Sequence, residues 1–556
     1  MDFLLFFIFY LIIAISVLGY GLLLNSKLKI YNFELNIGLI GLLGVLFLII
    51  YSYLSHYFSI IHTKEHNSIL LTFGLISFIY YFFKNKIKKL NFFFIFFIII
   101  FISFILYKTH DDFPYYHFPY TYYLTQNPFM LGIGNFTHGF RTPSSIFYLN
   151  SLFYLPIVNY YFFHMGAALF MGFSCISLFI DIKEKIKISN FDNIIIFKLL
   201  AFVFIFVFFY RLQEHGTDRS AQILILLLIG EIITLRNSYQ NYYFNRLLIK
   251  VFILLSLIIS LKAFFLIYLI LIIPIIFYLI KDKKIHKIKL IFKNSFFYIF
   301  LLMLILIILN YIFNTGCLIY PLPNACIFNF DWTIKLTEVN RMSLHYEQWS
   351  KAGSGPGYSV ENHAEYVKNF NWLPQWIEKY FFNKMLDFLS GLLLLILIFY
   401  ITLKSKIKII KKTKKLRFLY LFIFFISLEW FYNHPSLRYG GYCIIAALLF
   451  IPFSNYIAKY KQNTFFKTKI LGLVILAIII FLSRNINRLN YEKEFYNFEY
   501  LKDPKHRIVE QNFRIDTRIK NLLNKYETCI NMKKTCDNIV EGYLIDKKFG
   551  IYYFSK

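Results

Sequence analysis

The stretch KTHDDFPYYHFPYTYYLTQNPFMLGIGNFTHGFRTPSSIFYLNSLFYLP, Lys108 to Pro156, interrupts a long series of apolar runs and concentrates the residue types that those runs lack. It contains two adjacent aspartates, three histidines, one arginine, glycine-rich turns and many tyrosines. Apolar helices need none of these residues in order to fold. We therefore interpret the central loop (residues 108–157) as a functional segment that a membrane scaffold carries.

The composition of the chain is that of a membrane protein. Of its 556 residues, 58% are hydrophobic and only 16% are charged, and the mean hydropathy is +0.57. A soluble chain of this length would divide into several cores and carry more charge on its surface. Apolar runs of roughly 18 to 24 residues recur from end to end, about the length that crosses a bilayer. We predict an all-α integral membrane protein that has the lipid bilayer as a partner.

Twelve to fourteen of these apolar runs are predicted to span the bilayer as helices, and fourteen is the preferred number. The first run lies at the N-terminus, where the lack of a basic region and of a cleavage site favours a spanning helix over a signal peptide. The predicted spans are residues 3–24, 36–58, 68–83, 90–107, 158–180, 191–210, 220–235, 247–260, 263–280, 290–312, 386–403, 418–432, 441–458 and 468–483.

The basic residues lie in short clusters between the apolar runs. A net charge of +29 would by itself be compatible with binding to nucleic acid. Clusters of lysine and arginine in short connectors are, however, typical of cytoplasmic loops. We therefore predict no nucleic-acid partner. The basic connectors are residues 84–89, 181–187, 236–246, 281–289, 404–417 and 459–469.

An alternating path through the spans places the remaining segments on the outer side of the membrane. This path requires that Lys262 divides one long apolar tract into two spans. The last part of the chain contains no apolar run, and we predict that it forms a small external appendage. The outer segments are 108–157, 211–219, 313–385, 433–440 and 484–556, and the spans are grouped in 1–107, 158–312 and 386–483.

Four of the six cysteines form two closely spaced pairs in outer segments. Cys317 with Cys326, and Cys529 with Cys536, are predicted to form local disulfides if the compartment is oxidising. A zinc site made from the same four cysteines is the alternative. The other two cysteines lie inside apolar runs and are interpreted as small core residues.

Asp111 and Asp112 directly follow an apolar run and so lie at the outer membrane interface, where a lipid head group would be. A carboxylate there can accept a proton from a hydroxyl group or hold a divalent cation. His117 lies in the same polar stretch and is a third candidate catalytic residue. The structural alternative is a solvated helix end or a helix cap.

Three further segments contain candidate substrate-binding residues. Arg141 follows the glycine-rich turns of the central loop, and it can pair with a phosphate or with one of the aspartates. Asp218 and Arg219 lie in a short outer loop, as a second acidic site or as anchors for the span ends. Lys262 is costly inside an apolar tract unless it faces protein, water or an anion, although its side chain can also extend to the interface.

One more group of polar residues precedes a late span. His434, Arg438 and Tyr439 stand where the chain enters that span from outside. An arginine in this position suits an anionic head group or a phosphate. These residues therefore complete the set of candidate substrate-binding residues.

The order of these motifs resembles the GT-C superfamily of integral membrane glycosyltransferases. The similar segments are DDFPYYHFP (111–119), GIGNFTHGFRTPSS (132–145), SLKAFF (260–265), TGCLIYP (315–321) and PSLRY (435–439). The resemblance covers most of the membrane region and excludes the tail. It is nearest to bacterial members that have additional N-terminal spans.

The resemblance implies transfer of a sugar from a polyprenyl-phosphate donor to a hydroxyl of a glycan or lipid acceptor. It places the protein in the bacterial inner membrane, with the active site facing the periplasm. Asp111 or Asp112 would be the general base, and Arg438, Lys262 and Arg219 would neutralise the leaving phosphate. No cofactor is assigned, but a divalent metal, Mg or Mn, is a candidate between Asp112 and Asp218.

Three other functions remain open on the sequence. A polysaccharide polymerase or ligase would differ only in its acceptor. A transporter or flippase for a lipid-linked glycan would usually be built from repeats around a midplane site. The sequence shows neither repeats nor acid pairs at the midplane of the spans. Its ionisable clusters lie at the outer interface instead, which favours the enzyme. A purely structural membrane protein is the third alternative.

Overall fold

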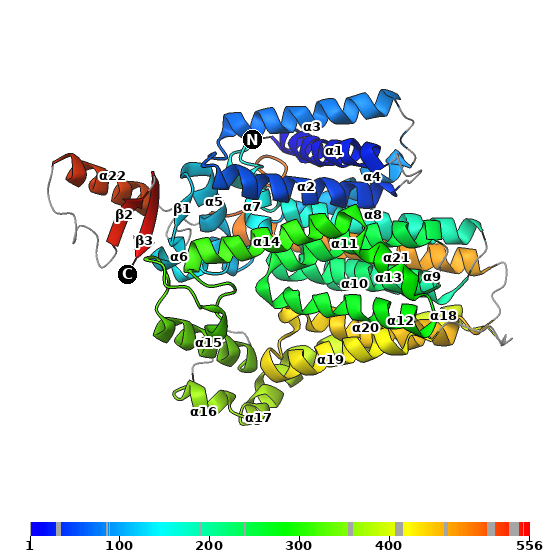
Figure 1. Cartoon of the computed structure of the whole chain (residues 1–556). Coiled ribbons are helices and arrows are strands. Elements are labelled where there is room, and N and C mark those ends of the chain that lie inside the picture. The colour runs from blue at the N-terminus through cyan, green and yellow to red at the C-terminus, as the bar shows by residue number, and fades with distance from the viewer. Residues whose placement is uncertain are drawn as a thin grey trace.

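The computed structural model is a bundle of helices with three short strands at one end (Figure 1). The structure describes residues 2–28, 35–84, 87, 89–188, 191–237, 241–353, 360–405, 415–460, 465–508, 517–532, 544–548 and 550–555. The longer helices are α1 (Phe3–Leu28), α2 (Ile37–Tyr57), α3 (Lys64–Lys84), α4 (Leu90–Phe104), α8 (Met165–Lys187), α9 (Asn193–Phe208), α10 (Gly216–Asn237), α11 (Asn241–Leu261), α12 (Ile272–Lys281), α14 (Ser295–Thr315), α15 (Leu336–Lys351), α18 (Leu386–Leu403), α19 (Arg417–Asn433), α20 (Gly441–Ile457), α21 (Phe466–Tyr496) and α22 (Thr517–Asn531).

Shorter elements make up most of the segments between these helices. The short helices are α5 (Phe118–Gln126), α6 (Ile133–Phe136), α7 (Ser145–Ser151), α13 (Ile288–Phe292), α16 (His363–Val367) and α17 (Leu373–Trp376), and the strands are β1 (Met130–Leu131), β2 (Leu544–Lys548) and β3 (Ile551–Ser555).

Nine helical segments within the described part of the chain are long and apolar enough to cross a membrane. They lie in α1, α2, α3, α8, α11, α12 with the turns before it, α14, α18 with the turns before it, and α21. The chain is therefore an all-α membrane protein. The other five predicted spans correspond to α4, α9, α10, α19 and α20, which are helical but are not among the nine. Of these, α4, α9 and α20 are apolar helices of only 10–17 residues.

The apolar tract around Lys262 is divided in two, as the sequence predicts. Helix α11 ends at Leu261, and Lys262 has an extended backbone, with φ −164° and ψ 145°. The chain then continues as a 3₁₀ segment, Ala263–Leu271, that packs against α11 and leads into α12. A lysine inside one continuous apolar helix would be costly to bury, and the break lets its side chain reach a carboxylate instead.

The two ends of the bundle differ in composition. The described residues of the basic connectors lie at one end, where Lys89 pairs with Glu184 and Arg236 pairs with Asp282 (Figure 1). The central loop and helices α15–α17 lie at the opposite end, which we call the loop end (Figure 1). The separation of the basic connectors from the central loop therefore agrees with the alternating path drawn from the sequence.

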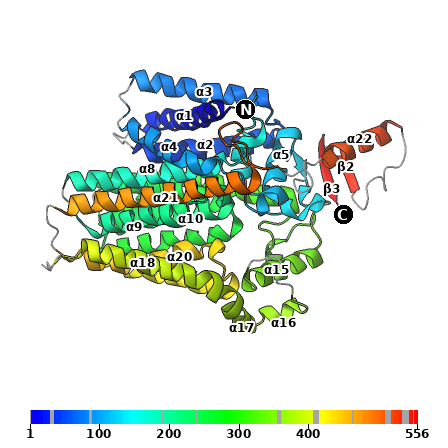
Figure 2. The same ribbon diagram turned by 180° about the vertical axis from the view of Figure 1, so that it is seen from behind.

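The C-terminal part of the chain contacts the central loop directly. Helix α21 continues to Tyr496, well beyond the predicted span end at residue 483, and runs along the back of the bundle (Figure 2). Strand β3 pairs in parallel with β1 of the central loop and antiparallel with β2. The side chain of Asn135 donates to the Phe554 carbonyl at 3.1 Å, and Phe554 is fully buried. The last strand of the segment that was predicted as an appendage is therefore part of a sheet with the central loop.

Candidate functional site

Four charged side chains from four separate segments meet at the loop end and form the charged cluster (Asp112, Asp218, Lys262 and Arg438). Arg438 donates through Nη2 to Asp112 Oδ2 and through Nε to Asp218 Oδ2, the latter at 3.1 Å. Lys262 Nζ donates to Asp218 Oδ1 at 2.7 Å. The sequence placed all four residues at ends of apolar runs, and the fold brings these ends together.

Helix ends position each member of the charged cluster. Asp112 precedes a single π-helical turn, Phe113–His117, and Asp218 lies in the first turn of α10. Arg438 lies in a 3₁₀ turn just before α20, and Gly440, with φ +100°, follows it at the point where the chain enters that helix. A φ in this range is strained for residues that carry a Cβ, so a glycine is favoured at the position where the chain enters α20.

The two aspartates of the charged cluster differ in the oxygens that they leave free. Burial alone would raise the pKa of Asp218, but Lys262 and Arg438 outweigh it and hold the pKa at about 2. Burial is likewise outweighed at Asp112, where the guanidinium of Arg438 lowers the pKa. Both oxygens of Asp218 carry a cationic partner, whereas Oδ1 of Asp112 accepts no hydrogen bond from the described residues. Asp218 therefore orients the two cations, and Asp112 retains a free acceptor.

Two neutral histidines stand beside Asp112. The Asp112 backbone N–H donates to His110 Nδ1 at 3.0 Å, and the rings of His110 and His117 lie parallel with centroids 6.3 Å apart. Burial lowers the pKa of His117 to about 3, and its Nε2 has no hydrogen-bond partner in the described part of the chain. Gly216 packs closely against this ring: a Cβ at position 216 would lie only 2.9 Å from His117 Cε1.

An aromatic residue underlies the cations of the charged cluster. Lys262 Nζ lies 4.5 Å from the centroid of the Tyr439 ring, and the Arg438 guanidinium lies 5.6 Å from it. The His434 ring is 5.8 Å from the same ring. Burial and the nearby Lys262 lower the pKa of His434 to about 4, so this imidazole is neutral at physiological pH.

Asp111 does not join the charged cluster, although it is the neighbour of Asp112. It is exposed and makes no hydrogen bond or ion pair within the described residues. The sequence could not separate these two aspartates as candidate bases. The geometry favours Asp112.

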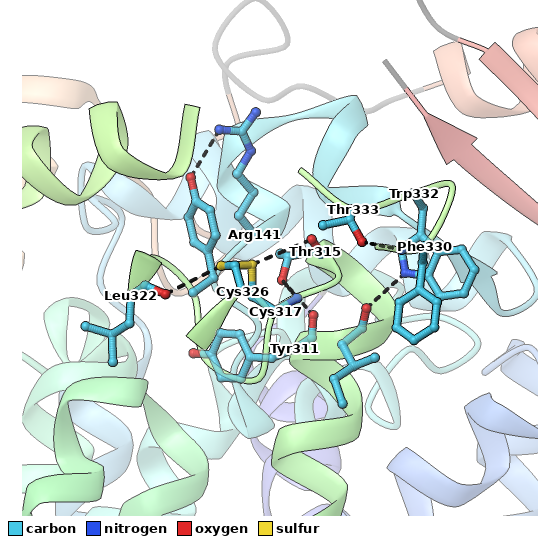
Figure 3. Close-up of a disulfide and its surroundings, with 11 residues drawn as sticks. Arg141, Tyr311, Thr315, Cys317, Leu322, Cys326, Phe330, Trp332 and Thr333 are labelled. Carbon is cyan, nitrogen blue, oxygen red and sulfur yellow. Dashed lines mark hydrogen bonds between the residues drawn. A yellow bond between two sulfur atoms is a disulfide. The ribbon is translucent and has the colours of Figure 1, made fainter. Parts of the chain in front are cut away.

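Arg141 also lies outside the charged cluster. It donates to Glu338 at 2.7 Å, to the Gly134 carbonyl at 2.9 Å and to the Tyr320 hydroxyl at 3.2 Å. Figure 3 shows Arg141 reaching this tyrosine beside a disulfide. The buried guanidinium thus ties the central loop to the long segment after α14, and its predicted role with a phosphate has no support from these contacts.

The disulfide in this region joins Cys317 and Cys326, one of the two pairs predicted from the sequence (Figure 3). Sulfur atoms bonded to each other are not thiolate ligands, so the alternative of a four-cysteine zinc site is wrong. Cys536, and with it the second predicted pair with Cys529, lies outside the described residues.

The residues at the charged cluster do not fit the divalent metal that the sequence suggested. Asp112 and Asp218 both bind the guanidinium of Arg438, and Lys262 adds a second positive charge. The two carboxylates are thus already neutralised by two cations. Within the described residues, no group of three or more His, Cys, Asp and Glu side chains is arranged to hold a metal ion.

Arg219 belongs to a neighbouring group of charges. Its Nη1 lies 3.3 Å from Glu214, which also contacts Arg211 and Arg488. Arg488 pairs in turn with Glu492, whose carboxylate accepts the backbone N–H of Tyr107 at 2.8 Å. The sequence prediction missed Arg488 and Glu492 because it ended the last span at residue 483. The run of charges just after that span was the available signal.

A second ionic network is buried inside the bundle, away from the loop end. Lys198 of α9 pairs with Asp181 of α8 and, at 2.6 Å, with Glu231 of α10. Lys250 of α11 lies 3.3 Å from the other oxygen of Glu231. Lys198, Glu231 and Lys250 lie inside predicted spans, and Asp181 lies directly after one, so the network joins ionisable residues that the sequence patterns did not single out. Asp181 and Glu231 escaped notice because each lies near the end of a run, next to a basic connector.

Comparison with known proteins gives one match. Residues 3–445 match a family model described as a domain of unknown function, DUF8201. This range contains the central loop and all four members of the charged cluster. No curated protein and no solved structure matches the chain. Because the matched range covers well over half of the sequence, the chain belongs to the DUF8201 family.

Proposed function

We propose that the protein is a GT-C-like membrane glycosyltransferase that moves a sugar from a polyprenyl-phosphate donor to a hydroxyl of a glycan or lipid acceptor. One observation carries the proposal. Asp112 keeps a carboxylate oxygen free beside Arg438, and Arg438 shares Asp218 with Lys262. A base and two fixed cations at one end of a membrane bundle match the needs of this transfer.

The transfer assigns a separate role to each part of the charged cluster. The acceptor oxygen forms a bond to the anomeric carbon of the sugar, and the bond from that carbon to the phosphate oxygen breaks. The hydroxyl proton goes to Oδ1 of Asp112. The electron pair stays on the phosphate, whose added negative charge is stabilised by Arg438 and Lys262. In this proposal the proton transfer and the departure of the phosphate both rely on side chains of the charged cluster and not on a metal ion.

The low pKa of Asp112 is consistent with a base that acts late in the reaction. A carboxylate paired with a guanidinium is a weak base toward a free hydroxyl. The acceptor hydroxyl becomes much more acidic as its bond to the sugar forms. Binding of the donor phosphate would also draw Arg438 partly away from Asp112, which would raise the basicity of that carboxylate at the moment of transfer.

The same proposal includes the placement of the protein in the membrane. We infer fourteen spans, with α4, α9, α10, α19 and α20 crossing together with the nine candidate segments. The shorter helices pack among other helices and need not match the full bilayer thickness. The basic connectors then face the cytoplasm, and the loop end faces the periplasm of a bacterial inner membrane. Cysteines introduced at Lys283 and Asp111 would test this by labelling from opposite sides.

The test of the function is a comparison of glycans in cells with and without the gene. The proposal expects one surface glycan or glycolipid to lose a sugar, while the corresponding polyprenyl-linked sugar accumulates at the outer face. Unchanged glycans together with an unchanged donor pool would contradict it. A polymerase or ligase would instead leave the sugar composition intact and change the chain length or the attachment of the polymer.

Transport of a lipid-linked glycan is the second candidate, and the buried ionic network favours it. Charged groups inside spans often mark the path of an ion or a substrate. The network around Lys198, however, is balanced, because two lysines face two carboxylates. A transporter would cause its lipid-linked substrate to accumulate at the inner face when the gene is lost, and this result separates the two functions.

A further inference from the structure

Three arginines contact Glu214 or Glu492 at the loop end, and a fourth, Arg484, shares the Tyr210 ring with Arg211; together they form the arginine cluster (Arg211, Arg219, Arg484 and Arg488). Arg211 and Arg219 each lie 3.3 Å from Glu214, and Arg488 lies 3.6 Å from it. Arg488 Nε also donates to Glu492 at 3.1 Å. Three of these arginines therefore share two carboxylates.

The cluster as a whole has more positive than negative charge. Arg484 has no acidic partner among the residues that the structure describes, and it donates instead to the Val207 carbonyl at 2.7 Å. The Glu492 carboxylate also accepts hydrogen bonds from the backbone N–H groups of Tyr107 and Lys108, so it is not available to the arginines alone. Four guanidinium groups against two carboxylates leave a surplus of two positive charges.

The surplus charge is open to a ligand. Arg484 is exposed, and 47% of the Arg211 side chain is exposed. Both guanidinium groups are held against Tyr210, with Arg484 at 4.8 Å from the ring centroid and Arg211 donating to the hydroxyl at 2.9 Å. Two exposed arginines fixed on one aromatic ring lose little freedom when they bind an anion.

The height of the arginine cluster along the bundle indicates where such an anion would lie. Helix α21 exposes Ile475, Leu476 and Ile479 on the side that faces away from the bundle. The continuous apolar run of this helix ends just before Arg484, and α9 ends at Phe208 just before Tyr210. Arginine and tyrosine at the ends of lipid-facing apolar runs lie at the level of the lipid head groups.

We propose that the arginine cluster binds the phosphate of an anionic phospholipid in the leaflet at the loop end. Guanidinium groups match the oxygens of a phosphate and can form paired hydrogen bonds with it. Free phosphate offers the same chemistry, but the position beside an exposed apolar helix face favours a phosphate that carries acyl chains. The site does not depend on the proposed sugar transfer, since none of its exposed arginines touches the charged cluster.

The test measures lipid retention by the full-length protein. The protein is placed in nanodiscs of equal parts phosphatidylglycerol and phosphatidylcholine, extracted into mild detergent, and its bound lipids are counted by native mass spectrometry. The double variant Arg211→Gln/Arg484→Gln is compared with Lys335→Gln/Lys368→Gln, which removes two exposed positive charges from the outer segment 313–385. We expect the arginine variant to retain phosphatidylglycerol about tenfold less than the wild type, and the lysine variant to retain it normally.

Two results would overturn the proposal. The first is equal retention by the arginine variant and the wild type, and the second is an equal loss in both double variants. A third arm adds inorganic phosphate. If millimolar phosphate displaces phosphatidylglycerol and stabilises the protein to the same degree, the site is one for small anions and the lipid assignment is wrong. Arg484→Gln alone, which removes no ion pair with a carboxylate of the described residues, replaces the double variant if the latter does not fold.

Discussion

Arg438 and Asp112, which lie 326 residues apart in the sequence, form an ion pair through Nη2 and Oδ2. The same guanidinium donates through Nε to Asp218. One arginine thus holds together the central loop, the start of α10 and the turn before α20. The charged cluster is assembled by this residue rather than by any one segment.

Replacement of Arg438 by glutamine is expected to lower sugar transfer by about 100-fold or more, because the leaving phosphate loses a fixed cation. Arg438→Lys retains the charge but cannot bridge two carboxylates, so its activity should lie between those of the wild type and Arg438→Gln. Transfer is measured in isolated membranes at matched protein abundance. Equal activity of the lysine and glutamine variants would show that the charge of Arg438 has no role.

The buried network inside the bundle makes a prediction about stability. Lys198→Met leaves Asp181 and one oxygen of Glu231 without their cation, and we expect a loss of about 3–5 kcal/mol of unfolding free energy. Addition of Asp181→Leu removes one of the unpaired charges and should restore part of the loss. Thermal unfolding in detergent of the two single variants and the double variant measures this coupling. Strictly additive effects would mean that the two residues do not interact.

Buried histidines predict a loss of stability in acid. Burial lowers the pKa of His117, His215 and His506 to about 3 from the ordinary value of 6.5. Between these values the unfolded state binds more protons than the folded state, so stability falls as the pH drops below 6.5 and levels off above it. Each histidine contributes about 1.4 kcal/mol per pH unit within this window.

The acid effect is measured as the unfolding temperature between pH 4.5 and pH 8. Removal of one titrating group, as in His506→Gln, should make the dependence on pH shallower. Asp218, with a pKa of about 2, stays ionised throughout this range and adds nothing to the slope. An unfolding temperature that does not change between pH 5 and pH 7 would contradict the prediction.

The pairing of β3 with β1 predicts that the C-terminus protects the central loop. Phe554 is fully buried, and Phe554→Ala is expected to cost about 3–5 kcal/mol locally. Residues 127–140 should then become sensitive to added protease, while the helices stay protected. The exposed Lys547 provides a control, because its side chain contacts Tyr552 and not Phe554, so that Lys547→Ala leaves the fully buried Phe554 in place. Equal cleavage of both variants would contradict a protective role for this strand.

Local sequence patterns predicted the parts of the structure that depend on local chemistry. Charged residues at the ends of apolar runs identified Asp112, Asp218, Lys262 and Arg438, because a bilayer permits such residues mainly at its surface or where they find a partner. The division of the tract at Lys262 follows from the same cost.

Long-range geometry decided the rest. The roles of Asp111 and Asp112 depend on which of two neighbouring residues faces α10 and α20, and no local pattern contains this information. Arg141 pairs with Glu338, which is far away in the sequence, and it therefore does not lie with the other predicted phosphate-binding residues. Strand β1 has two residues and exists only because β3 pairs with it, so its pattern was too short to recognise.

The comparison of Asp112→Asn with Asp111→Asn tests the proposed function most directly. The two variants change neighbouring residues in the same way, and of these two residues only Asp112 contacts Arg438. In cells that lack the wild-type gene, and at matched membrane abundance, Asp112→Asn should lose one glycan species while Asp111→Asn retains it. A full glycan profile with Asp112→Asn, or loss of the same species with Asp111→Asn alone, would contradict the assignment of Asp112 as the base.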